Sequence, residues 1–297
     1  MTPKLDVTAL AMGIVFSLMW SSAFATARII VADAPPLWAL TFRFAVSGAI
    51  AVGAARAMGQ DWRLTRPVAR SVVIFGLCQN GLYLGLNFVA LQWIEASLAS
   101  IIASAMPLIV ALLGWLWRGE RVGRLGQLGL ALGFAGVALI MGTRVTGGAS
   151  AGGIALCVVG ATALAVATLT VRSVSAGGNL LMVVGLQMWV GSAVLLVVAL
   201  LTEPLVITPS LPLATAMAYQ LLVPGLAATL LWFTLVARIG AIRASTFHFL
   251  NPFFGVAVAA ALLGEHVSAT DIAGVVTAMA GIMAVQLSRQ AARKAAS

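Results

Sequence analysis

Three residues in the second half of the chain have side chains suited to binding a small molecule inside an apolar run. The segment STFHFLNPFFG covers residues 245–255 and contains His248, Asn251 and Pro252. On a helix, His248 and Asn251 lie three residues apart on one face. An imidazole and a carboxamide both donate and accept hydrogen bonds, and the imidazole can also carry a proton. His248 therefore either bonds a neighbouring helix or contacts a substrate on a cavity wall.

Helix-breaking residues recur at matching positions. Pro252 has a counterpart in Pro107, 145 residues earlier, and Pro224 and Gly225 fall opposite Gln79 and Asn80 at the same shift. Proline removes a backbone donor and crowds the carbonyl four residues back, so it kinks or loosens a helix. Paired interruptions in two halves of a chain indicate a transporter site. We predict that the three prolines and Gly225 are hinges lining a path, with plain structural kinks as the alternative.

The other candidates are polar or aromatic side chains within apolar runs. Together with His248 and Asn251, the predicted substrate-binding or cavity residues are Trp20, Ser21, Gln79, Tyr83, Ser100, Ser104, Arg43 and Trp232. Serines often bond only their own helix, and aromatic residues often only pack. Arg43 either extends to the outer membrane interface or attracts a carboxylate. We predict no catalytic residue, metal site or cofactor, because Cys78 and Cys157 have no ligand partners nearby in the sequence.

The composition places these residues in a membrane. Of 297 residues, 62% are hydrophobic and 8% are charged, whereas a soluble domain carries roughly 25% charged residues. Residues 10–27 contain no charge, and about 20 apolar residues cross a bilayer as a helix. The fold class is therefore an all-α polytopic membrane protein. The net charge of +9 falls in short gaps between apolar runs, which fits membrane topology and not nucleic acid binding.

Ten apolar runs are long enough to span the bilayer. They cover 8–30, 36–56, 71–91, 96–117, 124–142, 151–171, 179–201, 214–236, 244–263 and 270–288. We expect the first run to be retained and not cleaved as a signal peptide, because it is long and has a second copy in mid-chain.

The two halves of the sequence resemble each other. Nine positions match between 99–136 and 244–281 at the shift of 145, including the proline and a Gly-Glu pair at 119–120 and 264–265. Each copy holds five spans, an odd number, so the second copy enters the membrane from the opposite side. We predict one transmembrane domain, 1–297, in which a first repeat (1–146) and an inverted second repeat (147–297) surround a central cavity.

Basic residues give an independent test of this inversion, because they concentrate in cytoplasmic loops. Fourteen of the 17 Lys and Arg residues fall on one side of the predicted membrane, Arg28 and Arg144 fall on the other, and Arg43 lies within a span. WLWRGERVGRLG in the first repeat has three arginines, and its partner AALLGEHVSATD has none. Both termini are therefore predicted to be cytoplasmic.

The chain resembles the drug/metabolite transporter superfamily, in its ten-helix EamA-type branch. The residues that carry the resemblance are PPLWALTFRF, ASIIASAMPLIVALLGWLWRGERV and its echo ASTFHFLNPFFGVAVAAALLGEHV. His266 departs from the family pattern, which usually has arginine after Gly-Glu. The resemblance implies a bacterial exporter of amino acids, aromatic ones among them.

We therefore predict a multi-pass secondary transporter of the bacterial inner membrane that exports small metabolites, in particular apolar or aromatic amino acids, by alternating access. No carboxylate falls at mid-membrane, where coupled carriers often place one, so the prediction favours facilitated diffusion. The alternatives are a channel or sensor subunit and, less favoured, an intramembrane enzyme. The expected partners are a small-molecule substrate and the lipid bilayer.

Glycines 126, 129, 133 and 136 form a small-residue helix face that packs within one subunit or between subunits, so the chain is predicted to be a monomer or a weak homodimer.

Overall fold

The computed structural model describes residues 6–120, 122–170 and 179–294, and within them it contains ten helical segments long and apolar enough to cross a membrane. These segments are Val7–Asp33, Pro36–Ala57, Arg66–Ala90, Ala96–Arg118, Arg124–Thr146, Ala151–Leu169, Leu180–Thr202, Leu211–Ile239, Arg243–Leu263 and Ala269–Ala291. All ten predicted spans are present, and no strand occurs in this part of the chain. The all-α polytopic prediction is confirmed.

Four of the ten spans are interrupted. In chain order the elements are α1 (Val7–Asp33), α2 (Pro36–Ala57), α3 (Arg66–Phe75), η1 (Gly76–Leu84), α4 (Gly85–Ala90), α5 (Ala96–Ser104), α6 (Met106–Arg118), α7 (Arg124–Thr146), α8 (Ala151–Thr170), α9 (Leu180–Thr202), α10 (Leu211–Leu222), η2 (Val223–Ala227), α11 (Ala228–Ile239), α12 (Ala241–Thr246), η3 (Phe247–Leu250), α13 (Asn251–Leu263) and α14 (Ala269–Lys294). The segments η1 and η2 are π-helical and η3 is a 3₁₀ turn. Pro107 and Pro252 each lie in the first turn of the helix that follows a break.

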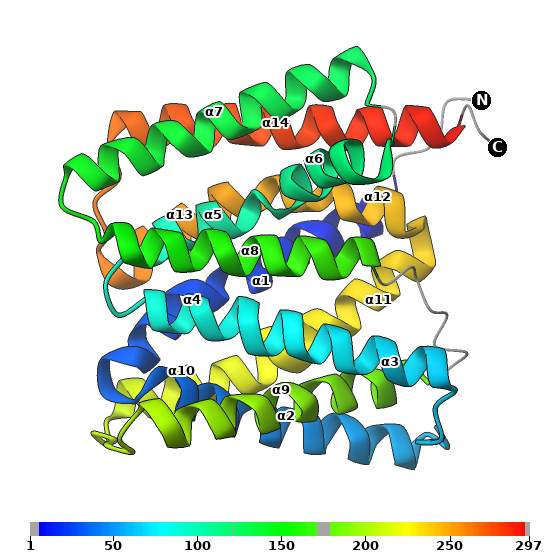
Figure 1. Ribbon diagram of the computed structural model, residues 1–297, viewed down its shortest axis with the longest axis vertical. Helices are drawn as coiled ribbons and strands as arrows, with labels where there is room; N and C mark the ends of the chain where they lie inside the picture. The colour runs from blue at the N-terminus through cyan, green and yellow to red at the C-terminus, as the bar shows by residue number, and fades with distance from the viewer. Residues whose placement is uncertain (1–5, 121, 171–178, 295–297) are drawn as a thin grey trace. The chain divides into compact units, whose positions relative to one another are not determined.

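The chain forms two compact units, and unit 1 comprises Met1–Ala25, Ala96–Gly147 and Val223–Ser297. In this unit α7 and α14 lie side by side along most of their length (Figure 1). A Cβ atom at Gly281 of α14 would lie 2.2 Å from the backbone nitrogen of Gly133 in α7. The predicted small-residue face therefore packs within one subunit, and the oligomeric state stays a prediction.

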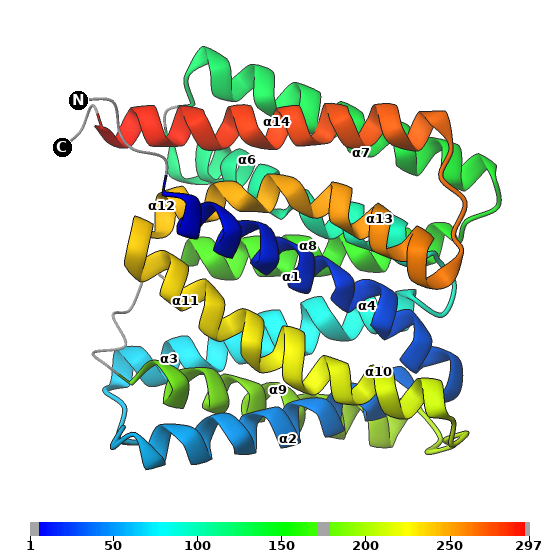
Figure 2. The same cartoon turned by 180° about the vertical axis from the view of Figure 1, so that it is seen from behind.

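A second helix pair in unit 1 is formed by α5 and α13, which contact each other where Gly255 faces Ser100. A Cβ atom at Gly255 would lie 2.0 Å from the Ser100 hydroxyl oxygen, so only glycine allows this approach. On the other side of the unit, α1 packs against α11 and α12 around Ala9, Leu235 and Ala244 (Figure 2).

Unit 2 comprises Thr26–Glu95 and Gly148–Leu222. Its main helix pair is α2 with α9, in which the Ser192 hydroxyl donates to the Thr41 carbonyl at 2.9 Å and the Trp189 indole donates to the Ala45 carbonyl at 3.2 Å. In the same unit, η1 and α4 pack against α8 and η1 also packs against α9.

Corresponding spans of the two sequence halves run antiparallel, which confirms the inversion. In the α2–α9 pair, Thr41 faces Ser192 whereas the later residue Ala45 faces the earlier residue Trp189. The fifth and tenth spans also cross in opposite directions, because Gly129 of α7 faces residues 281–285 whereas the later Gly136 faces residues 274–278. Both units draw spans from both sequence halves, so the boundary between repeats at 146 and 147 stays a prediction.

The two arginines on the predicted outer side have local partners within their own units. Arg28 donates to the Leu91 carbonyl, and Arg144 forms an ion pair with Asp271 at 3.0 Å. Their side chains therefore stabilise the fold, which explains why they depart from the cytoplasmic bias of the basic residues. Lys4, Arg121 and Arg172, which contribute to that bias, lie outside the described residues.

Candidate functional site

Three aromatic side chains of unit 1, Phe16, Trp20 and Trp232, form a cluster with His248. The Phe16 ring lies 4.8 Å from Trp232, 5.9 Å from Trp20 and 5.5 Å from the His248 imidazole, in each case between ring centroids. Trp232 and His248 lie 5.2 Å apart. Such distances are typical of interacting aromatic rings. The cluster combines flat apolar surfaces with one polar ring, which suits a ligand with an apolar or aromatic side chain.

The break before Pro252 positions His248 and Asn251 beside α1. In the 3₁₀ turn, the backbone N–H of Asn251 donates to the His248 carbonyl and not to the Phe247 carbonyl four residues back. The Phe247 carbonyl accepts a hydrogen bond from the Ser17 hydroxyl at 2.9 Å. The Ser21 hydroxyl donates to the Asn251 carbonyl at 3.2 Å. A broken helix persists in lipid only where neighbours satisfy its backbone, and here two serines one turn apart on α1 do so.

Buried polar atoms without partners occur next to this break. The Asn251 side chain is 6% exposed; its amide nitrogen lies 3.1 Å from Nδ1 of His248, but its Oδ1 atom has no hydrogen-bond partner. On α5, the hydroxyl oxygens of Ser97 and Ser100 are also buried and unpartnered, whereas Ser104 donates to the Ser100 carbonyl at 2.7 Å. Unsatisfied buried polar atoms are uncommon in proteins, so these atoms are candidates for contacts with a ligand or with water.

Arg43 is the buried charge of unit 2. It lies on α2, its side chain is 6% exposed, and its Nε atom has no hydrogen-bond partner among the described residues. No ion pair joins it to any acidic residue in the described ranges; its guanidinium lies over the Phe44 ring at 5.3 Å. An unpaired buried charge is costly, and intramembrane charges are functional candidates for that reason.

The π-helical segment η1 brings amide side chains into the core of unit 2. Asn80 donates to the Gln187 carbonyl of α9 at 2.9 Å, and Asn87 donates to the Tyr83 carbonyl at 2.7 Å while its Oδ1 atom is unpartnered. Tyr83 is buried and Gln79 is half-buried. π-helical turns are frequent at functional sites. The corresponding segment η2, which contains Pro224 and Gly225, belongs to unit 1.

An acidic residue of unit 2, Glu203, contacts the start of α2. Glu203 accepts a hydrogen bond from the Leu37 amide at 3.0 Å through its carboxylate, and its backbone carbonyl accepts one from the Trp38 indole at 3.2 Å. Burial raises the pKa of the Glu203 carboxyl, and the bond from Leu37 opposes that shift. Glu203 therefore caps α2.

A cavity of about 490 Å³ in unit 2 contains none of the predicted site residues. Its lining is almost wholly apolar and consists of Ala34, Trp38, Ala39, Phe42, Leu205, Ile207, Pro209, Ser210, Leu213, Ala214 and Met217. Several of these side chains are exposed, including Phe42 and Leu205, as expected for a surface covered by lipid. We therefore place the candidate site at the buried polar groups and not in this cavity.

The structure places the predicted site residues in both units. His248, Asn251, Trp20, Ser21 and Trp232 lie together in unit 1, where Ser100 and Ser104 line the α5–α13 pair; Arg43, Gln79 and Tyr83 lie in unit 2. Within residues 6–120, 122–170 and 179–294, no group of three His, Cys, Asp or Glu side chains could hold a metal ion.

Sequence reasoning missed Phe16 and Ser17, which complete the arrangement around His248. Their signal was present in the sequence, because Phe16 precedes Trp20 by four residues and Ser17 precedes Ser21 by four. Such spacing places each pair on one helix face. The sequence also did not predict the buried contact in unit 2 between Gln220 and Thr26, in which the Gln220 side chain donates to the Thr26 hydroxyl at 2.8 Å.

Comparison with known proteins decides the family. The model of the EamA-like transporter family matches residues 7–142 and again residues 151–287, once in each half of the chain. The chain belongs to the EamA-like transporter family. This EamA-family protein is 27% identical over 282 residues to the uncharacterized transporter YvbV of Bacillus subtilis, covering 94% of this chain and 92% of that protein. It is 26% identical over 283 residues to the protein PecM of Dickeya dadantii, covering 90% and 89%.

The fold of the EamA-family protein also has a solved counterpart. A crystal structure with 21% sequence identity superimposes with a TM-score of 0.66 over 96% of this chain and 98% of its own. This likeness shows a shared fold. Together with the family match and the ten spans, it establishes that the chain is a multi-pass membrane protein of a transporter family.

Proposed function

We propose that this EamA-family protein exports small amphipathic metabolites, specifically amino acids with apolar or aromatic side chains, across the bacterial cytoplasmic membrane by alternating access. The observation that carries the proposal is Arg43, a buried guanidinium whose Nε atom has no partner within the described residues. A substrate carboxylate would supply the missing counter-charge, because guanidinium binds carboxylate with two parallel hydrogen bonds.

Unit 1 by itself has groups that suit an amino acid. The rings of Phe16, Trp20 and Trp232 offer an apolar surface, and the unpartnered Oδ1 atom of Asn251 can accept a hydrogen bond from an ammonium group. The ammonium group and apolar side chain of such an amino acid match these residues of unit 1. These residue types support the substrate class, and the substrate of choice within that class is left to experiment.

Transport is proposed to be facilitative, with cytoplasmic termini. The acidic residues lie near the ends of spans, as Asp33, Glu203 and Asp271 do, so the centre of the membrane lacks the carboxylate that proton- or sodium-coupled carriers commonly use. His248 is then the candidate for any proton coupling. Accumulation of substrate strictly in step with an imposed pH gradient in liposomes would refute the facilitative mechanism.

Counterflow in liposomes tests the function. Purified protein is reconstituted with a high internal concentration of unlabelled phenylalanine or leucine, and entry of the labelled amino acid is measured. A carrier that exchanges substrate gives a transient accumulation of label. The matched control is phenethylamine, which keeps the ring and the ammonium of phenylalanine but lacks the carboxylate, and we expect it to give at least tenfold less counterflow.

The outcomes separate the candidate functions. Equal counterflow of phenylalanine and phenethylamine would refute the role assigned to Arg43. Flux of label without transient accumulation would indicate a channel, and absence of flux for the whole panel of amino acids would refute the substrate class.

A further inference from the structure

The Gly-Glu pair of each repeat ends a membrane helix in the same way. Gly264 after α13 and Gly119 after α6 both adopt a left-handed conformation, with φ of 67° and 64°. This conformation suits glycine, and it projects the next residue, Glu265 or Glu120, beyond the end of the helix. The two carboxylates are therefore related by the repeat, but their surroundings differ.

Glu265 binds the beginning of the opposite repeat's broken helix. Its Oε1 atom accepts a hydrogen bond from the Ala96 amide at 2.7 Å, and its Oε2 atom accepts one from the Ser97 amide at 3.0 Å. The first amides of a helix lack partners within it and carry partial positive charge. Ala96 and Ser97 are 0% and 1% exposed, so this carboxylate joins the end of α13 to two buried residues at the start of α5.

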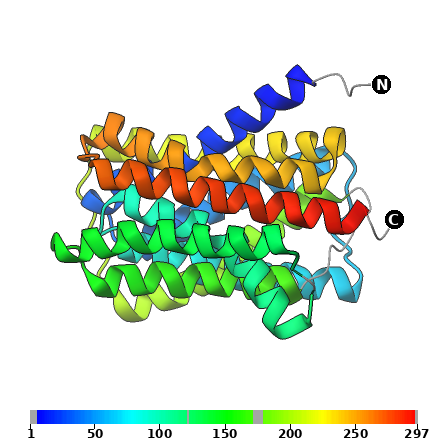
Figure 3. The same ribbon diagram turned by 90° about the horizontal axis from the view of Figure 1, so that it is seen from above.

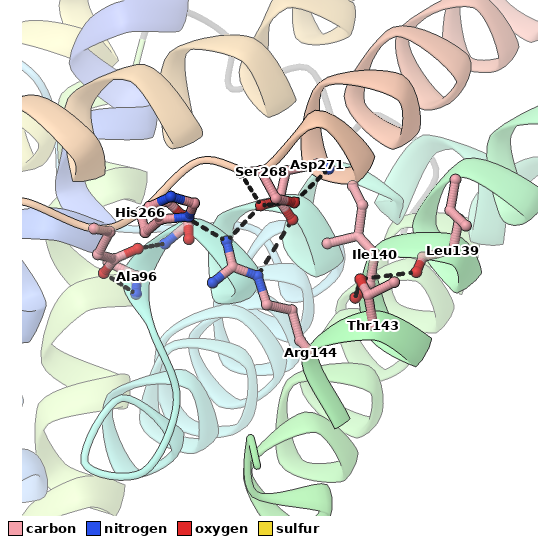
Figure 4. A network of polar contacts seen from close by, with 10 residues as sticks. Ala96, Leu139, Ile140, Thr143, Arg144, His266, Ser268 and Asp271 are labelled. Carbon is pink, nitrogen blue, oxygen red and sulfur yellow. Dashed lines mark hydrogen bonds and ion pairs between the residues drawn. The ribbon is translucent and has the colours of Figure 1, made fainter. Parts of the chain in front are cut away.

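The loop that carries Glu265 is fixed by Arg144, on the predicted outer side. Figure 4 shows Arg144 reaching from the end of α7 to Asp271 and to the backbone of His266. The two bonds to the Asp271 carboxylate measure 3.2 and 3.0 Å, and the Asp271 side chain is 2% exposed. Asp271 also accepts bonds from the amide and hydroxyl of Ser268. The Asp271 carboxylate is thus buried and accepts bonds from both Arg144 and Ser268.

The inner counterpart is more exposed. The shift of 145 residues pairs Arg144 with Arg289, and Arg289 lies 3.7 Å from the Glu120 carboxylate, with side chains 34% and 47% exposed. The Glu120 carboxylate folds back over Gly114, where a Cβ atom would lie 2.7 Å from Oε2. The residue corresponding to Gly114 in the second repeat is Ala259, which is buried. The first repeat alone therefore has this space for its glutamate.

The helices beside the two carboxylates also differ in how they pack: they contact each other at the outer end and a third helix at the inner end. On the outer side, α5 and α13 pack directly, with Gly255 against Ser100. On the inner side, their repeat counterparts α12 and α6 each pack on α14, and in the view of Figure 3 they lie on either side of that helix. Unit 1 is therefore closed at its outer end by Glu265, while its inner end is not closed by Glu120.

We propose that Glu265 and Glu120 are reciprocal gate residues of unit 1, each closing one end of that unit against the broken helix of the other repeat. This inference rests on the alternating access and orientation proposed above. In the structure described here the outer gate, Glu265 with Ala96 and Ser97, is closed. In the opposite state Glu265 leaves α5, and Glu120 leaves Gly114 to close the inner end of unit 1 against the span Arg243–Leu263.

Thiol labelling from outside the cell tests the gates without any substrate. The full chain carries Cys78→Ala, Cys157→Ala and the probe Ser97→Cys, which lies behind the outer gate, and intact bacterial cells are treated with a membrane-impermeant maleimide. The parent labels slowly because the site is buried. Glu265→Gln replaces a charge-assisted contact by a weaker neutral one, and we expect labelling to accelerate about tenfold.

A second variant changes the inner gate, while the thiol probe stays at the outer gate. Gly114→Ala introduces the Cβ atom that Ala259 has in the other repeat and displaces the flexible end of Glu120 from its resting place. The outward-open state should become more populated, so external labelling of Ser97→Cys should rise several-fold. Adding Glu120→Gln should cancel this rise. Gly142→Ala, in open space on α7, is the control and should leave labelling unchanged.

Either of two results overturns the proposal: labelling that does not respond to Glu265→Gln in folded protein, or a response to Gly114→Ala that is absent or persists with Glu120→Gln. Because the assay needs no transport, labelling that follows the expected pattern while counterflow fails for all amino acids would refute the substrate class and leave the gates standing. Normal counterflow with labelling that does not respond to the variants would refute the gates and leave the substrate class standing.

Discussion

Replacing Arg43 with methionine should stabilise the empty protein and weaken substrate binding. Methionine retains the length and apolar stem of the side chain but removes the charge. A residue that only supports the fold would show the opposite effect on stability. The sign of two measurements on one variant therefore distinguishes a binding role from an architectural one.

The magnitudes follow from the surroundings of the side chain. Arg43 is 6% exposed and its Nε atom is unpartnered, so removing the charge relieves a desolvation penalty. Replacing buried charged groups by apolar residues of similar size stabilises proteins by up to about 1–4 kcal/mol. A hydrogen bond to a charged group contributes about 1.5–3 kcal/mol, so its loss should weaken amino acid binding by roughly 10–150-fold.

The assay is thermal unfolding of purified protein in detergent, with and without a saturating amino acid. The wild type should gain stability with ligand, because a ligand that binds the folded state stabilises it. Arg43→Met should unfold at a higher temperature without ligand and gain little when the same ligand concentration is added. Arg28→Met is the matched control: Arg28 donates to the buried Leu91 carbonyl, so its loss should lower stability.

The reasoning is refuted if Arg43→Met lowers stability as Arg28→Met does and leaves the ligand-induced gain intact. In that case Arg43 would be a structural residue, as the alternative interpretation of the sequence holds.

Three further variants test the packing and charge contacts of unit 1. Gly281→Ala should destabilise the protein by at least about 1–3 kcal/mol, the range for overpacking, because its Cβ atom would meet the backbone of α7 at 2.2 Å; thermal unfolding measures this. Ser17→Ala leaves the Phe247 carbonyl without its hydroxyl donor and should lower the unfolding temperature by an amount equivalent to about 1–3 kcal/mol. The Arg238 side chain, which bonds Asp6, holds the pKa of that carboxyl below its usual range. The Asp6 contribution to stability is therefore present at neutral pH and is lost as the pH falls below about 4, so Asp6→Asn and wild type should differ in unfolding temperature at pH 7 and converge at pH 3.

For each of these variants, one result would contradict the prediction. Gly142→Ala, on the same helix pair but in open space, should be tolerated, and equal effects at Gly281 and Gly142 would argue against close packing of α7 on α14. Thr234→Ala removes an exposed hydroxyl that bonds only its own helix, and an effect as large as that of Ser17→Ala would count against the bond to Phe247. A constant difference between Asp6→Asn and wild type from pH 7 to pH 3 would exclude the titration of Asp6 as its cause.

The span positions and the inversion could be predicted because their signals are local. A run such as 10–27 is long, apolar and uncharged, and a segment of that kind crosses a bilayer whatever its neighbours are. The Lys and Arg bias and the odd number of spans in each repeat then set the direction of the chain. Antiparallel pairing of α2 with α9 and of α7 with α14 agrees with that prediction.

The breaks were also visible, but their structural consequences were not. Pro107, Pro252 and Pro224 marked the interrupted spans correctly. The sequence did not show that Ser17 would satisfy the carbonyl released at η3, because that contact joins residues 230 positions apart. For the same reason, nothing near Glu265 in the sequence identified the first amides of α5 as its partners.

By itself, the sequence determined that this chain crosses the membrane ten times in two opposed repeats, since hydropathy, length and charge act on each segment separately. The tertiary structure alone decided which face of each helix meets another helix, placed Phe16 beside His248 and left the Nε atom of Arg43 buried without a hydrogen-bond partner. The physical reason is that lipid is as apolar as a protein core, so a hydrophobic pattern that would separate inside from outside in water does not do so here.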